Sequence, residues 1–109
     1  MAAYRSKGAP AGFEALGDRT RLAIVEVLST HPHTVGEVAA KVPVSRPAVS
    51  QHLKVLKDAG LVSERAEGTR RIYRLNPAGV AALRDQLDTF WSRALQGYEE
   101  VIDNPGGST

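Results

Sequence analysis

The stretch from Ser45 to Val62, SRPAVSQHLKVLKDAGLV, constrains the fold more than any other part of the chain. Its apolar residues recur at helical spacing, which predicts a helix with one face turned toward a core. Ser45 is a suitable N-cap, because its hydroxyl can accept a hydrogen bond from an N–H that has no partner within the helix. Proline is tolerated in the first turn, and Gly60 provides the left-handed residue that ends the helix. The residues of the apolar face are Val49, Leu53 and Leu56.

The opposite face of this predicted helix carries short polar groups and long cations, and its first acidic residue is Asp58. Such a surface suits the base edges and the phosphate backbone of DNA. His52 lies at the flank of the apolar face, so contact with DNA and packing beside Leu53 and Leu56 are equally good interpretations. The residues expected to contact DNA are Ser45, Arg46, Pro47, Ser50, Gln51, His52, Lys54 and Lys57.

A shorter helix is predicted just before this one. Thr34 and Glu37 form the T-x-x-E pattern of a capping box, and we expect the helix that it opens to reach about Val42. Pro43 and Val44 then make a tight turn. Two helices joined in this way constitute a helix-turn-helix, although a helical hairpin packed only for stability has a similar pattern. The basic outer face of the second helix favours DNA binding.

After Leu61 the apolar period changes to that of a strand. The pattern predicts a β-hairpin with strands at Val62–Ala66 and Arg70–Leu75 and a turn at Glu67–Gly68–Thr69. Cations near a hairpin tip can reach an adjacent DNA groove or its phosphates. Charge also protects an exposed strand edge from pairing, but four arginines exceed that need. We therefore predict a DNA-binding wing that uses Arg65, Arg70, Arg71 and Arg74.

The formal net charge is only +2, but the positive charge is concentrated in the middle of the chain. Residues 41–74 contain eight basic and three acidic side chains, whereas residues 1–40 are balanced and residues 75–109 are net acidic. A merely solvated surface more often interleaves its signs. The asymmetry indicates that a polyanion faces one side of the fold.

A long final helix is predicted from Asn76 and Pro77, an N-cap and N1 pair, to Asp103. Its apolar stripe is too long for a small monomer to cover, so we expect self-association through a two-fold interface. A cofactor pocket lined by Trp91 and Tyr98 is a less favoured alternative. The residues expected at the dimer interface are Phe13, Leu16, Leu83, Leu87, Phe90, Trp91, Ala94, Leu95 and Tyr98.

The N-terminal part adds an arm, two helices and a loop. Residues 1–11 are small and polar, which predicts a flexible arm. A short helix is expected at Phe13–Leu16, followed by a second one from its cap, Asp18, to about Ser29. The histidines of the His31–His33 loop are predicted to be solvated rather than to bind a metal. The buried side of the second helix is predicted to consist of Leu22, Ile24, Val25, Val27 and Leu28.

The length of 109 residues predicts one domain, which we place at residues 12–103, with a disordered tail at 104–109. The absence of cysteine excludes disulfides, thiolate metal sites and cysteine nucleophiles. No apolar run is long enough for a signal peptide or a membrane span, so we expect a cytoplasmic location. No convincing catalytic set occurs, and the chain is not expected to be an enzyme or to need a cofactor.

The Ser45–Val62 stretch, together with FEALGDRTRLAIVEVL at Phe13–Leu28 and the downstream GTRRIYRL, resembles the arsenic-repressor (ArsR) family of winged helix-turn-helix regulators. The resemblance covers roughly Ala11 to Ile102. It implies a mainly α fold with a small β-hairpin wing, and a transcriptional regulator that is most often a repressor.

Many members of that family sense metals through cysteines in the third helix or through Asp, His and Glu ligands along the last helix. Here the third-helix region reads VGEVAAKV, without a thiol, and the last helix has no histidine. Its carboxylates alone would make a weak transition-metal site. The chain therefore resembles the metal-independent branch of the family, and its effector is unknown. The carboxylates concerned are Asp85, Asp88, Glu99 and Glu100.

These patterns predict a homodimer that binds double-stranded DNA at an inverted repeat, with Ser45–Lys57 in the major groove and the wing on the flanking backbone or minor groove. The alternative is a winged helix used as a protein-interaction module, which docks a different chain through its C-terminal helix. No membrane contact is expected.

Overall fold

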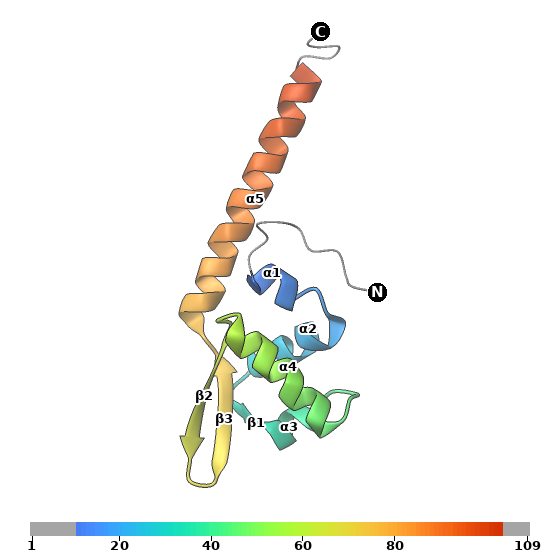
Figure 1. Ribbon diagram of the computed structural model, residues 1–109. Helices are drawn as coiled ribbons and strands as arrows, with labels where there is room; N and C mark the ends of the chain where they lie inside the picture. Colours follow the sequence, from blue (N-terminus) through green and yellow to red (C-terminus); the bar gives the residue numbers. More distant parts are fainter. Residues whose placement is uncertain (1–10, 104–109) are drawn as a thin grey trace.

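The computed structural model describes residues 11–103, and the arm and tail predicted at the two ends lie outside them apart from Ala11. Figure 1 shows a mainly helical fold with a small sheet, and the predicted winged helix-turn-helix architecture is confirmed. In chain order the elements are α1 (Ala11–Ala15), α2 (Arg19–Leu28), β1 (His33–Thr34), α3 (Val35–Ala39), α4 (Arg46–Asp58), β2 (Val62–Glu67), β3 (Arg70–Leu75) and α5 (Pro77–Asp103).

Three helices begin where the sequence places a side-chain cap. Asp18 before α2 and Ser45 before α4 each accept a hydrogen bond from the backbone N–H three residues further on, at 3.0 and 3.3 Å. Thr34 and Glu37 form the predicted reciprocal capping box at α3, with distances of 2.8 and 3.2 Å. These bonds satisfy N–H groups that the helices leave unpaired, so the local sequence alone sets the three starts.

Helix α3 is shorter than predicted, because it ends at Ala39 rather than near Val42. Pro43 follows Val42, and a proline disfavours the helical conformation of the residue before it. The backbone N–H of Lys41 bonds to the carbonyl of Val38 at 2.9 Å, which tightens the chain as it leaves the helix. The turn between α3 and α4 therefore starts earlier than the apolar pattern indicated.

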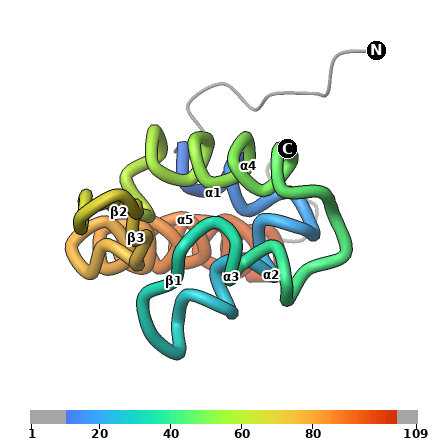
Figure 2. The backbone as a smooth tube through the Cα atoms, turned by 90° about the horizontal axis from the view of Figure 1, so that it is seen from below, coloured from blue at the N-terminus to red at the C-terminus, as the bar shows by residue number. Residues whose placement is uncertain are grey.

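The core lies between α2, α3, α4 and the base of the hairpin. Val49, Leu53 and Leu56 of α4 are completely buried, as their spacing predicted. The prediction for α2 was wrong at Leu22, which is exposed, because Ile24 and Leu28 face the core. Figure 2 shows α4 along one edge of the molecule, with α2 and α3 on its inner side. One face of α4 is thus fixed by packing while the other is left to solvent.

The hairpin is part of a three-stranded antiparallel sheet with the strand order β1-β3-β2. Glu67 pairs with Arg70, so the turn consists of Gly68 and Thr69, and Glu67 belongs to the strand rather than to the turn. Gly68 has a φ of +64°, a left-handed conformation that glycine adopts without steric cost. Strand β1, which was not predicted, pairs with the other edge of β3.

His33 in β1 is buried, with only 1% of its surface exposed, so the prediction of a solvated side chain was wrong for this residue. Its Nε2 lies 2.9 Å from Nζ of Lys41, and its Nδ1 lies 2.6 Å from the carbonyl oxygen of His31. Since a lysine ammonium only donates, Nε2 is the acceptor and Nδ1 donates to the carbonyl. His33 is therefore a core histidine with both ring nitrogens paired, whereas His31 is exposed and stacks on its ring.

Helix α5 runs away from the other elements, at the opposite end of the molecule from the hairpin tip (Figure 1). It is continuous through Gly79 and Gly97, and none of its residues is buried. The Cα radius of gyration is 18.1 Å, whereas a compact domain of this size has about 13 Å. Among residues 11–103, no helix combines the length and apolarity needed to cross a membrane.

Helix α1 begins at Ala11, two residues before the predicted start. Gly12 is buried against α5, where a Cβ added to it would stand 3.0 Å from a methyl carbon of Leu83. This tertiary contact extends the helix and is not encoded in the local sequence. Phe13 lies beside Phe90 of α5, with ring centroids 6.1 Å apart in an edge-to-face arrangement.

Candidate nucleic-acid interface

The side chains predicted to contact DNA lie on the outer face of α4 and at its N-cap. Most of them are exposed, and the buried residues of the same helix hold this face in place. Pro47 lies in the first turn, after the cap at Ser45. The exposed residues are Ser45, Arg46, Pro47, Ser50, Gln51, Lys54 and Lys57.

His52 is half-buried and points toward the protein. Its Nδ1 lies 3.2 Å from Nη1 of Arg21 in α2, and Nε of Arg21 donates to the carbonyl oxygen of Ala15 at 2.5 Å. Because a guanidinium only donates, Nδ1 of His52 is the acceptor. Nδ1 of His52 is thus occupied by a contact within the protomer that neither interpretation named. This contact joins the end of α1 and the start of α2 to α4.

Most of the cations in the candidate interface are paired with carboxylates of the same protomer. Lys54 pairs with Asp58 at 2.9 Å, one turn further along α4. On the hairpin, Arg65 pairs with Glu67 at 3.1 Å, and Nε of Arg74 donates to the Ser63 hydroxyl at 3.4 Å. These pairs were not predicted from the sequence. The i,i+4 spacing of Lys54 and Asp58 was the one signal for them that the sequence contained.

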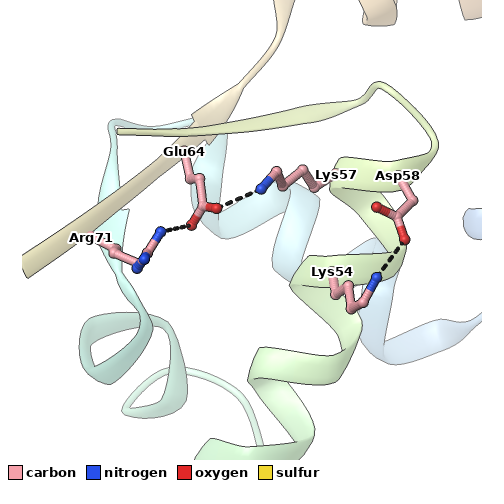
Figure 3. A network of polar contacts seen from close by, with 5 residues as sticks. All are labelled: Lys54, Lys57, Asp58, Glu64 and Arg71. Atoms are coloured by element: carbon pink, nitrogen blue, oxygen red, sulfur yellow. Dashed lines mark hydrogen bonds and ion pairs between the residues drawn. The ribbon is translucent and has the colours of Figure 1, made fainter. Parts of the chain in front are cut away.

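Glu64 of β2 lies between Lys57 of α4 and Arg71 of β3 and so connects α4 to the hairpin (Figure 3). Its carboxylate accepts a hydrogen bond from Nζ of Lys57 in α4 at 2.5 Å and pairs with Nη1 of Arg71 in β3 at 3.4 Å. Tyr73 lies opposite Glu64 in the sheet register, and its hydroxyl also favours the ionised form of this carboxylate. The hydrogen bond from Lys57 is the main cause that lowers the pKa of Glu64, followed by the bond from Tyr73. Glu64 is therefore an ionised carboxylate shared by two cations, Lys57 and Arg71.

Tyr73 responds in the opposite sense. Partial burial raises the pKa of its hydroxyl, and the hydrogen bond to Glu64 adds to the effect. Tyr73 therefore remains a neutral donor. The Tyr73 ring packs partly against the core, and this packing holds Tyr73 in place beside the Glu64 network.

A hollow of about 300 Å³ lies between α4 and the hairpin. It is lined on the helix side by Ser50, Lys54, Lys57 and Asp58 and on the wing side by Glu64, Arg71 and Tyr73. The cations among these residues outnumber the carboxylates by one. The remaining basic residues predicted to contact DNA, Arg46 and Arg70, are exposed and form no ion pair with another residue of the described range.

Among the residues predicted at a dimer interface, Phe13 is half-buried beside Phe90, and the others fall into two groups. Leu16 and Leu83 pack partly against the core of the protomer. The others from α5 are exposed along one helix face, together with Val101 and Ile102. The structure thus leaves a long apolar surface uncovered. This exposed group consists of Leu87, Phe90, Trp91, Ala94, Leu95 and Tyr98.

Within residues 11–103, no group of three or more His, Cys, Asp or Glu side chains could hold a metal ion. An exposed polar helix fixed by a helix-turn-helix core, with an arginine-bearing hairpin beside it, defines a winged helix-turn-helix DNA-binding protein. The family model described as "Bacterial regulatory protein, arsR family" matches residues 18–64. This range runs from the cap of α2 through the recognition helix to Glu64.

Two relatives extend the match. The chain is 58% identical over 109 residues to the HTH-type transcriptional regulator Rv2034 of Mycobacterium tuberculosis, with 100% of both chains covered. It is 36% identical over 76 residues to the transcriptional repressor SdpR of Bacillus subtilis, and the aligned region covers 70% of this chain and 81% of that protein. The chain belongs to the ArsR family and is a DNA-binding transcriptional regulator, not an enzyme.

Solved structures agree with this assignment. One described as a possible transcriptional regulator for arsenical resistance has a TM-score of 0.70 and 41% identity, covering 82% of this chain and 96% of that chain. The homodimeric winged helix-turn-helix DNA-binding domain Mb0332 of Mycobacterium bovis has a TM-score of 0.63 and 28% identity, covering 84% of this chain and 91% of that chain.

Proposed function

We propose that the protein is a homodimeric transcriptional repressor that binds an inverted-repeat operator. The observation that carries this proposal is the division of α4 into two faces. Val49, Leu53 and Leu56 anchor one face, while Gln51 and its neighbours are free to meet base edges on the other. Residues 12–103 form the DNA-binding and dimerisation domain. It operates in the cytoplasm, where bacterial DNA is accessible.

Dimerisation is supported by the exposed apolar face of α5 and by the homodimeric state of a similar structure. A surface this apolar is rarely left open on a monomer. In the dimer, each protomer places one α4 in a major groove, with half-sites about one helical turn (~34–36 Å) apart. Arg70 and Arg71 of each wing bind the flanking backbone or minor groove. Repression follows when the bound dimer blocks polymerase, in keeping with SdpR, one of the relatives named as repressors.

The test is selection from a random-sequence DNA pool at about 150 mM salt, followed by sequencing of the retained duplexes, with the protein's mass measured in the same buffer. Enrichment of an inverted repeat by a dimer would support the proposal. Retention without an enriched sequence would indicate a non-specific binder. No retention, together with a mass that shows a different chain bound, would favour the alternative of an interaction module that docks its partner on α5.

A further inference from the structure

Two cations expected to reach DNA belong to different elements, yet one carboxylate holds both of them. Lys57 projects from the last turn of α4 and Arg71 from β3, and Glu64 lies between them (Figure 3). The Glu64 side chain is 17% exposed, whereas Lys57 and Arg71 are 47% and 67% exposed. The carboxylate therefore lies at the base of the hollow between helix and wing, and the cations lie toward its mouth.

This arrangement leaves donors available for an anion. A lysine ammonium has three N–H donors and a guanidinium has five, and the contacts to Glu64 occupy only part of them. Lys57 and Arg71 can therefore keep Glu64 and still donate to a phosphate group above it. The hollow of about 300 Å³ has room for one phosphodiester group, since a water molecule takes about 30 Å³ of liquid.

The same arrangement penalises a phosphate that engages one cation alone. Glu64 stays ionised at neutral pH, because its donors lower its pKa. A phosphate that displaces one cation or fails to reach it faces this carboxylate across a short distance, and like charges at that range repel. The phosphate is tolerated only when Lys57 of α4 and Arg71 of the wing both bridge the two anions.

We propose that Glu64 makes binding of a DNA phosphate in this hollow depend on Lys57 and Arg71 together, and so acts as a positioning residue for sequence specificity. The inference rests on the proposed DNA-binding function. When α4 sits correctly on its cognate bases, both cations reach the phosphate. On other sequences the helix docks imperfectly, one bridge is lost, and Glu64 repels the backbone. Glu64 thereby weakens non-cognate binding more than cognate binding.

The experiment measures the affinity of Glu64→Gln for the duplex recovered from the random pool and for a scrambled duplex, across a series of salt concentrations. Removal of the carboxylate should tighten binding to the scrambled duplex by about threefold to tenfold. Binding to the cognate duplex should change by less than about twofold, so the specificity ratio falls. The dependence of scrambled-DNA binding on salt should steepen by about one unit, because the one bridge that is lost on non-cognate DNA is regained and one further cation pairs with phosphate.

Glu67→Gln is the matched control, since it removes the same charge from the same strand, but from a carboxylate that pairs with Arg65 near the hairpin tip. It should change both affinities by a similar factor and leave the specificity ratio intact. Equal changes of the ratio in Glu64→Gln and Glu67→Gln would overturn the proposal, because charge alone would then explain the effect. Parallel loss of both affinities with a lower melting temperature would overturn it in favour of a purely structural role.

A double-mutant cycle with Lys57→Gln tests the coupling. If Glu64 acts through Lys57, the effect of Glu64→Gln on the specificity ratio should largely vanish in the Lys57→Gln background, whereas an undiminished effect would overturn the proposal. If Glu64→Gln does not fold, Lys57→Gln should weaken cognate binding more than Arg70→Gln. Lys57→Gln leaves the Glu64 carboxylate exposed to phosphate, whereas Arg70 forms no ion pair with another residue of the described range; equal losses would overturn the proposal. A wild-type protein without sequence preference would overturn the proposed function itself, whereas preserved specificity in Glu64→Gln would overturn only the role of Glu64.

Discussion

Gly79 of α5 lies directly against the backbone carbonyl of Gly60. A Cβ atom added to Gly79 would stand only 1.8 Å from that carbonyl oxygen. The side-chain amide of Asn76 donates to the same carbonyl oxygen at 3.0 Å. The backbone N–H of Asn76 donates to the carbonyl of Leu61 at 2.9 Å. The start of α5 is therefore joined to the turn that follows α4, through a contact that only glycine permits.

Gly79→Ala should lower the free energy of unfolding by about 1–3 kcal/mol, because the added methyl group meets backbone and the two segments must move apart. This loss opposes the gain of up to about 1 kcal/mol that alanine normally brings to a helix interior. Urea unfolding at a fixed protein concentration measures the difference. Gly97→Ala is the control, since nothing lies within 4 Å of its added Cβ in the protomer. A stable Gly79→Ala variant would contradict the close contact.

Gln51→Ala should weaken binding to the cognate duplex by about 1–3 kcal/mol and relax the base preference at one position, if Gln51 reads a base edge. Gln51 is exposed, so the unfolding midpoint should not change. Competition binding with cognate and scrambled duplexes measures the effect. Arg70→Ala is the comparison, because loss of a phosphate contact should weaken both duplexes alike and shallow the salt dependence by about one unit. Equal loss on both duplexes for Gln51→Ala would exclude base reading.

Leu95→Glu should convert the proposed dimer to a monomer, because it places a charge in the apolar face of α5, where Leu95 is 57% exposed in the protomer. The helix content of the protomer should persist, since α5 contributes no buried residue to its core. Sedimentation equilibrium and circular dichroism test the two statements. Gln96→Glu introduces the same charge at the neighbouring exposed position and should leave the dimer intact. A dimeric Leu95→Glu protein would place the interface elsewhere.

Acid should destabilise the protein through a small set of carboxylates. The backbone N–H of Arg21 lowers the pKa of Asp18, that of Thr34 lowers the pKa of Glu37, and Lys57 lowers the pKa of Glu64. A carboxylate whose pKa is lower in the folded state stabilises the fold at every pH above its unfolded value, and that stability is lost as the pH falls through the folded value.

For Glu64 the unfolded reference is 4.5, so the loss should occur below that pH. The free energy of unfolding, measured by urea at about pH 7 and about pH 3.5, should decrease more in the wild-type protein than in Glu64→Gln. Glu67→Gln again supplies the control. An identical pH dependence in the wild-type protein and in Glu64→Gln would show that the Lys57–Glu64 contact contributes nothing to folding.

The sequence predicted the features whose signals are local. The capping residues Asp18, Thr34 and Ser45 fixed the helix starts, and the apolar spacing in α4 identified its buried face. The hairpin was readable from its change of period and from Gly68. Each of these depends on residues within about two turns of a helix or one strand pair, and such signals survive in the sequence alone.

Several features that were missed depend on contacts between different elements. Strand β1 has only two residues, and its partner Tyr73 lies forty positions after His33. The burial of His33 follows from that pairing, so the loop pattern around it was misleading. The link from Lys57 to Glu64 likewise joins two elements whose relative placement the sequence does not state. Local patterns therefore identified the interface but not the ion pairs within it.

The short strand β1 ties the wing to the start of α3, because Thr34 both pairs with Ile72 of β3 and caps α3. The wing and the helix-turn-helix are therefore joined as one unit, with a fixed spacing between the hairpin and α4. This spacing cannot change to fit an operator whose groove or backbone is displaced. The duplex has to bend or twist instead, and the cost of deforming it depends on sequence even where the protein touches no base. Base pairs between the helix site and the wing site should then influence affinity through the stiffness of the DNA.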